Sequence, residues 1–111
     1  MDKYFIDKEL YEALKDLSFE IINILDKDKV SYNTMYFVEL MFNHELRQLI
    51  PHYINYNLNT FYLDDYSFFV KIKFKLNNEI NTFIVKCDKR IISYRIVDHD
   101  LTNNEVIELF E

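Results

Sequence analysis

Residues 70–87 decide the fold, and they read VKIKFKLNNEINTFIVKC. In the first half of this stretch the apolar residues Val70, Ile72, Phe74 and Leu76 alternate with Lys71, Lys73 and Lys75, which is the period-two pattern of a strand with one apolar and one basic face. Asn77 and Asn78 then interrupt the alternation, and a second run rich in β-branched and aromatic residues follows. The segment therefore predicts two antiparallel strands joined by a tight turn.

Further strands are predicted on both sides of this hairpin. After a polar break at residues 88–90, residues 91–97 alternate again and predict a third strand. Before the hairpin, residues 53–63 alternate apolar side chains with asparagines, which predicts one more strand at an edge of the sheet. Consecutive strands joined by short turns form an antiparallel meander, so we expect three or four strands in chain order.

Two helices are predicted before the strands. Residues 8–26, with Asp7 as N-cap, place apolar side chains three and four positions apart. A second helix begins after Ser31 or Asn33 and extends to about Ile50. Its apolar residues occupy more than one face, so we expect this helix to be the central, well-covered one. They are Met35, Phe37, Val38, Leu40, Met41, Phe42, Leu46, Leu49 and Ile50.

The C-terminus predicts a short helix over residues 103–110. Thr102 and Glu105 have the spacing of a capping box. We expect Val106, Leu109 and Phe110 to dock on the rest of the chain.

These elements define an α+β fold with the order ααβββ(β)α. At 111 residues, half of them hydrophobic, the chain has the length and apolar content of a single compact domain, residues 1–111. Because the clearest strands have one apolar and one basic face, we expect the helices mainly on one face of the sheet.

The composition excludes several common kinds of site. The chain has no glycine, so glycine-rich phosphate loops, dinucleotide fingerprints and nucleophile elbows are excluded. Turns that need a positive φ must use Asn or Asp instead. Cys87 is the only cysteine, which fits a reducing, cytoplasmic environment without an intrachain disulfide. The N-terminal residues carry acids and no long apolar run follows, so we expect neither export nor membrane insertion.

Charge is segregated along the chain. Residues 1–70 contain 6 Lys or Arg against 12 Asp or Glu, residues 71–95 contain 7 against 2, and residues 96–111 contain none against 5. The segments thus carry −6, +5 and −5. The basic residues of the predicted sheet that share its non-apolar face are Lys71, Lys73, Lys75, Lys86 and Arg95.

Two interpretations of this basic face compete. With Phe69 on the same side, it is a candidate nucleic-acid-binding surface in which lysines neutralise phosphates and a ring stacks on a base. The simpler interpretation is that lysines keep a strand face solvated and prevent edge-to-edge pairing. We favour the simpler one, because acidic flanks weaken the attraction for phosphate. A third possibility is that acidic partners, including a second copy of this protein, bind this face.

Aromatic residues make up 17% of the chain and are densest between His52 and Phe69. Tyrosine interleaved with asparagine is typical of protein-binding surfaces, so this segment is the candidate contact region. Its candidate contact residues are Tyr53, Tyr56, Phe61, Tyr62 and Tyr66. The first helix adds an acidic face able to imitate nucleic-acid phosphates, formed by Glu9, Glu12, Asp16 and Glu20. The alternatives are that the rings line the core, that the acids are only solvated, or that the patch joins two copies in a homodimer.

No residue pattern specifies catalysis, a cofactor or a metal. His44, His52 and His99 lack ligand spacing with one another, and Asp98-His99-Asp100 is expected to be a solvated turn. Cys87 has no evident activating base and is expected to be a small, partly buried hydrophobic residue.

The general profile is short, acidic, glycine-free and rich in Asn, Lys, Ile and Tyr. This profile is similar to that of small proteins from AT-rich bacteria and their phages, among which anti-CRISPR and toxin-immunity inhibitors occur. We therefore expect a non-catalytic inhibitor that occupies a functional surface of another protein, such as a nucleic-acid-binding effector or a toxin. The alternatives are a nucleic-acid-binding module that uses the lysine strand, and a small enzyme with a site assembled in space.

Overall fold

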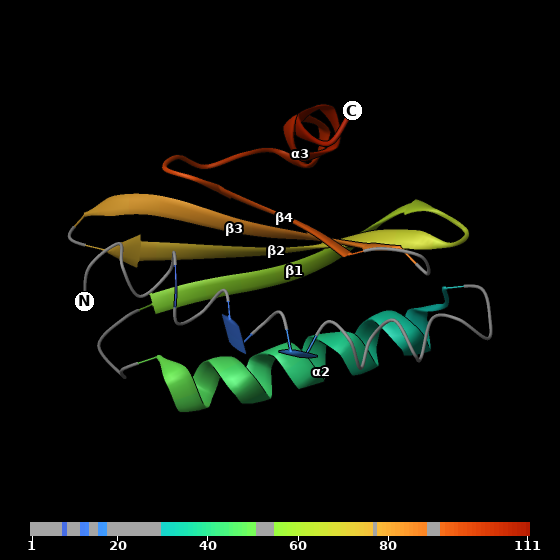
Figure 1. Ribbon diagram of the computed structural model, residues 1–111, viewed down its shortest axis with the longest axis horizontal. Coiled ribbons are helices and arrows are strands. Elements are labelled where there is room, and N and C mark those ends of the chain that lie inside the picture. Colours follow the sequence, from blue (N-terminus) through green and yellow to red (C-terminus); the bar gives the residue numbers. More distant parts are fainter. Residues whose placement is uncertain are drawn as a thin grey trace.

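A computed structural model describes residues 8, 12–13, 16–17, 30–50, 55–76, 78–88 and 92–111. Within them four antiparallel strands form one sheet in the order β1-β2-β3-β4, which is the predicted meander with all four strands (Figure 1). The elements are α2 (Tyr32–Leu49), β1 (Asn55–Asp64), β2 (Ser67–Leu76), β3 (Glu79–Asp88), β4 (Ile92–Val97) and α3 (Asn103–Leu109).

The α+β class is confirmed, and the described part has one helix before the sheet and one after it. Most of the helix expected over residues 8–26 lies outside the described residues. Of its described members, Leu17 is helical and buried, whereas Glu12 and Asp16 are helical and exposed.

The predicted starts of α2 and α3 are confirmed, whereas the one at Asp7 lies outside the described residues. The Ser31 hydroxyl caps α2 by accepting a hydrogen bond from the Thr34 backbone N–H. At α3, the Thr102 hydroxyl accepts from the Glu105 backbone N–H, and the Glu105 carboxylate accepts from the Thr102 backbone N–H. These contacts satisfy N–H groups that have no partner within the first helical turn.

The turn between β2 and β3 uses asparagine where glycine is common. Asn78 has a φ of 66°, in the left-handed region, and it is the only described residue with positive φ. Asparagine tolerates this region better than most other non-glycine residues, so a glycine-free chain can still close the hairpin here.

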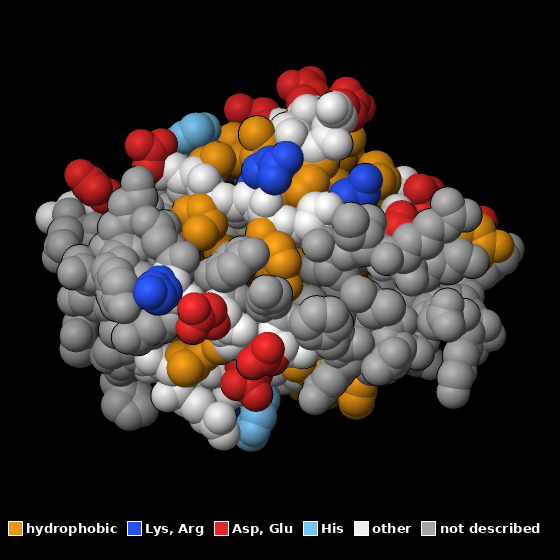
Figure 2. Space-filling model, viewed as in Figure 1, with side chains coloured by type: hydrophobic (Ala, Val, Ile, Leu, Met, Phe, Trp, Pro, Cys, Tyr) orange, Lys and Arg blue, Asp and Glu red, His pale blue; other side chains and the backbone are white. Residues whose placement is uncertain are grey.

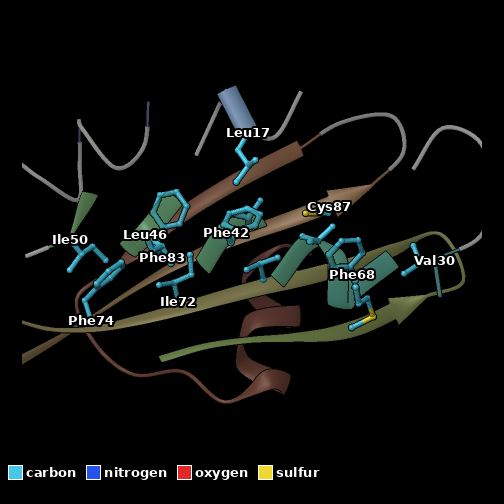
Figure 3. Packing of buried hydrophobic residues seen from close by; sticks show 14 residues of the cluster. Leu17, Val30, Phe42, Leu46, Ile50, Phe68, Ile72, Phe74, Phe83 and Cys87 are labelled. Atoms are coloured by element: carbon cyan, nitrogen blue, oxygen red, sulfur yellow. The ribbon is translucent and has the colours of Figure 1, made fainter. Parts of the chain in front are cut away.

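The main core lies between α2 and one face of the sheet (Figures 1 and 3). Val38, Phe42 and Leu46 of α2 are fully buried. They pack in one cluster with the even-numbered residues of β2 and the odd-numbered residues of β3, which share a face because side chains alternate along strands. The strand residues of the cluster are Phe68, Val70, Ile72, Phe74, Phe83, Val85 and Cys87.

A second core lies on the opposite face, where we expected solvent. Phe69 and Ile84 of the lysine-bearing face are fully buried beneath Leu101 and Val106. The expectation that the helices lie mainly on one sheet face therefore fails for α3, which covers the other face (Figure 1). The physical reason is that apolar residues interrupt the lysine row at one end of the strands and need a cover of their own.

The docking residues of α3 differ in one position from those expected. Val106 is buried and Phe110 packs against the second core, as predicted, but Leu109 is 39% exposed and Ile107 takes its place.

Candidate functional site

The aromatic segment between residues 52 and 69 is mostly used by the fold. Phe68 and Phe69 are fully buried, whereas Tyr56 and Phe61 are half-buried. Of the described rings of this segment, Tyr62 and Tyr66 are exposed, by 37% and 45%. His52 and Tyr53 lie outside the described residues. Among its described residues the segment therefore supplies two exposed rings of the predicted contact region.

Helix α2 carries apolar side chains that are more exposed than these two tyrosines. From the sequence we expected some of them in the interior and made no prediction for the others. Tyr32, Tyr36 and Leu40 are exposed by 81%, 63% and 49%, and Phe37 by 50%. The expectation that α2 is well covered is therefore wrong for its outer surface. The sequence did show that α2 has apolar residues on more than one face. That pattern fits a buried helix, and it also fits a helix that contacts a second partner.

Side-chain contacts fix α2 alongside β1. The rings of Tyr32 and Tyr62 meet edge to face with centroids 5.5 Å apart. Further along, the Thr60 hydroxyl donates to the Glu39 carboxylate at 2.7 Å, and the Tyr56 hydroxyl donates to the Asn43 side-chain oxygen at 3.1 Å. The two elements thus run in opposite directions, with the start of α2 beside the end of β1.

We call this surface the aromatic side, and it comprises Tyr32, Tyr36, Leu40 and Tyr62 together with the outer edge of β1. Tyr32, Tyr36 and Leu40 are four residues apart, so they form one stripe along the helix. Tyr32 is the member that contacts β1, so the stripe borders the strand. Residues 55–63 contain no charged side chain, which leaves this strand edge neutral.

The turn between β1 and β2 is held by Asp64. Its carboxylate accepts hydrogen bonds from the Tyr66 backbone N–H and from the Ser67 hydroxyl, both at 2.8 Å. The pKa of the Asp64 carboxyl lies below its ordinary value mainly because of the bond from the Tyr66 backbone N–H, and next because of the bond from the Ser67 hydroxyl.

Because the pKa of Asp64 is lower in the folded chain than in the unfolded one, the ionised carboxylate stabilises the fold above the ordinary carboxyl pKa. This stabilisation is lost as the pH falls through the lowered, folded-state pKa. Asp64→Asn should lower the free energy of unfolding at neutral pH by about 0.5 kcal/mol, because the carboxylate is exposed and screened. It should also flatten the acid limb of stability against pH in urea titrations. Glu79→Gln, which changes an exposed acid of the neighbouring hairpin, is the control, and an equal flattening by it would contradict this role.

The candidate nucleic-acid-binding residues share one sheet face, as the strand register places them together. The amine of Lys71 donates to the Leu101 carbonyl oxygen at 2.9 Å, and that of Lys73 lies 3.4 Å from the Asp100 carboxylate. Lys75 is exposed and Lys86 is half-buried. Two of the lysines therefore hold the segment that leads into α3.

The aromatic partner expected for these lysines is inaccessible. Phe69 lies between Phe61 and Phe110, with ring centroids 5.2 Å and 5.3 Å away. Arg95 is exposed, and its guanidinium lies over the Phe110 ring at 5.4 Å. No base can stack on Phe69 while α3 is docked.

The C-terminal segment presents a second surface, which we call the acidic surface. Its members Asp98, Asp100, Glu105, Glu108 and Glu111 are all exposed. Residues 96–111 contain no Lys or Arg, and Figure 2 shows the acidic side chains gathered over α3. The hydrogen bonds from Thr102 lower the pKa of Glu105, which keeps this carboxylate ionised. Of the acidic residues predicted in the first helix, Glu12 and Asp16 are exposed, and Glu9 and Glu20 lie outside the described residues.

The histidines and the cysteine form no catalytic arrangement within the described part of the chain. His44 is exposed and lies 3.2 Å from the Gln48 side-chain nitrogen, and His99 lies 3.2 Å from the Asp98 carboxylate in an exposed bend. Cys87 is fully buried, which raises the pKa of its thiol well above the ordinary value and keeps it unreactive. The residues described contain no group of three His, Cys, Asp or Glu side chains able to hold a metal ion.

Comparison with known proteins adds no relative. No protein-family model, curated protein or solved structure matches the chain. In the described residues no helix has the length and apolar character needed to cross a membrane.

Proposed function

We propose that the protein is a non-catalytic inhibitor that binds a basic surface of another protein and keeps that surface from its natural ligand. The observation that carries this proposal is the acidic surface, where five exposed carboxylates occur in residues 98–111 without a Lys or Arg among them. A nucleic-acid-binding effector or a toxin is the class of partner that such a surface fits, because basic grooves respond to field and shape.

The acidic surface lies on a segment that is packed against the sheet, and this order favours binding. Val106 is fully buried and Leu101 nearly so, and Lys71 and Lys73 hold the preceding segment. A surface that is already ordered loses little conformational entropy on binding. Leu109, which follows Glu108 in sequence and is 39% exposed, adds apolar area for contact.

The alternative of direct nucleic-acid binding has weaker support. It needs lysine amines that are free for phosphate and a ring that is free for a base. Lys71 and Lys73 already have acceptors from the chain, and Phe69 is covered.

Glu108→Lys should weaken binding to the partner by about tenfold or more, because it places a like charge against a basic surface. The substitution suits the fold, since Glu108 is exposed in the last turn of α3, where a cation interacts favourably with the helix dipole. The partner is first captured from the native cell with the tagged protein and identified by mass spectrometry. Binding of the purified partner is then measured by calorimetry across a range of salt concentrations.

The matched control is Glu79→Lys, which makes the same charge change at the β2–β3 hairpin. It should leave the affinity near that of the wild type. A captured partner whose affinity is insensitive to salt and to Glu108→Lys would contradict the proposal, and so would the absence of any partner at low salt.

A further inference from the structure

We propose that the aromatic side joins two copies of this chain, with their β1 strands paired antiparallel around a two-fold axis perpendicular to the sheet. The two four-stranded sheets then form one continuous sheet, and the two α2 helices lie side by side on one of its faces. This inference does not depend on the inhibitor function, because it concerns a different surface.

The outer edge of β1 is built to accept another strand. β1 is ten residues long, and among the described residues β2 is its only neighbour in the sheet. Exposed edges are commonly guarded by charged residues, by proline, by β-bulges or by shortness. Residues 55–61 have none of these features, and the register irregularity of β1 falls between Tyr62 and Asp64, at the end of the strand. The other edge strand, β4, has only six residues and carries Arg95, so its shortness and its charge both guard it.

The stripe on α2 would add a helix layer to the contact made by the β1 edge. Successive residues of a helix are about 100° apart, so Tyr36 lies just beyond the flank whose Glu39 and Asn43 contact β1, and Leu40 lies further round the helix on the side away from the sheet. Tyr36 therefore faces outward over the open edge, and Leu40 faces outward above it. Pairing of two β1 edges would bring the two stripes together and remove their exposed apolar area from water. Both elements are roughly 30 Å long, which suits an interface of about 800 Å² per copy.

Charge distribution favours a second copy over an unrelated partner. α2 runs opposite to β1, so Arg47 lies toward the Asn55 end of the aromatic side and Asp64 and Asp65 lie at the other end. A two-fold axis brings unlike ends together, so Arg47 of each copy meets the carboxylates of the other. Arg47 is the only Lys or Arg in α2 and β1, and the surface is thus complementary to itself.

The arrangement leaves the acidic surface open. α3 lies on the face opposite α2, and a two-fold axis perpendicular to the sheet keeps both α3 helices on that face. The dimer would present two acidic surfaces in the same direction.

Sedimentation equilibrium of the purified protein tests this inference. At about 0.1 mM the wild type should show twice the chain mass of 13.7 kDa. Leu40→Glu should raise the dimer dissociation constant by about a hundredfold, because the symmetric interface meets the buried charge twice. Leu40 is already half exposed, so the monomer should tolerate the change, which circular dichroism checks.

The matched control is Phe37→Glu, the same kind of change at an equally exposed residue of α2 that points away from the open edge. It should remain dimeric. A second variant, Arg47→Gln, should weaken the dimer several-fold and make its dissociation constant less sensitive to salt, because it removes the charge without reversing it. A monomeric wild type, a dimeric Leu40→Glu variant or a monomeric Phe37→Glu variant would each overturn the inference. Loss of dimerisation with retained partner binding would leave the proposed function intact.

Discussion

Phe42→Ala should lower the free energy of unfolding by about 3–5 kcal/mol, one of the two largest effects we expect in this chain. Phe42 is fully buried at the centre of α2, in the cluster that joins the helix to β2 and β3 (Figure 3). Alanine removes the ring and leaves a cavity that close-packed neighbours fill only in part. Urea unfolding followed by circular dichroism measures the change.

Phe37→Ala is the matched control for this prediction. It is the same substitution on the same helix, but the Phe37 ring is half exposed. Its cost should therefore be below about 1 kcal/mol. Similar losses for the two variants would show that α2 does not pack on the sheet by the face described above.

Phe69→Ala should lower the free energy of unfolding by a similar amount, about 3–5 kcal/mol, and should also loosen the C-terminal segment. Phe69 is fully buried on the α3 face, where its ring contacts those of Phe61 and Phe110. Aromatic pairs of this kind contribute beyond the area they bury. Limited proteolysis should then cleave the segment after β4 faster than in the wild type, while urea unfolding measures the stability.

Lys75→Ala serves as the control on the same strand and face. Its side chain is exposed and lies outside the second core, so stability and cleavage rate should stay near those of the wild type. If Phe69→Ala left the C-terminal segment as protected as before, the second core would not be what holds α3 in place.

The sheet could be predicted from local pattern, because its signals lie within single strands. The alternation of residues 70–76, the Asn77-Asn78 turn and the capping box at Thr102 each depend on near neighbours in sequence. The register then places Lys71, Lys86 and Arg95 on one face, as predicted.

The side on which each helix packs could not be predicted in the same way. Phe69 and Ile84 interrupt the polar face at neighbouring positions of β2 and β3, but only the strand register shows that they form one apolar patch. The lysines of this face predicted a solvated surface, but the burial of Phe69 and Ile84 under the α3 segment outweighed that signal.

Much of the exposed aromatic surface lies on α2, outside the segment in which we expected it, for a related reason. Tyrosine and phenylalanine are equally suited to a core and to a contact surface, so composition alone cannot separate the two roles. Phe68 and Phe69 point to opposite faces of β2, and both are buried because this central strand is covered on both faces. Tyr32 and Tyr36 stayed outside because the inner face of α2 was already occupied by Met35, Val38 and Phe42.

Hydrogen–deuterium exchange of the β1 amides, compared between the wild type and Leu40→Glu at equal concentration, tests most directly whether the open edge is covered by a second copy. Every second amide of β1 points away from β2, and pairing would protect it. We predict that these amides exchange at least about tenfold more slowly in the wild type, while the β4 amides exchange equally in both proteins. Equal exchange of the β1 amides in the two proteins would contradict the account.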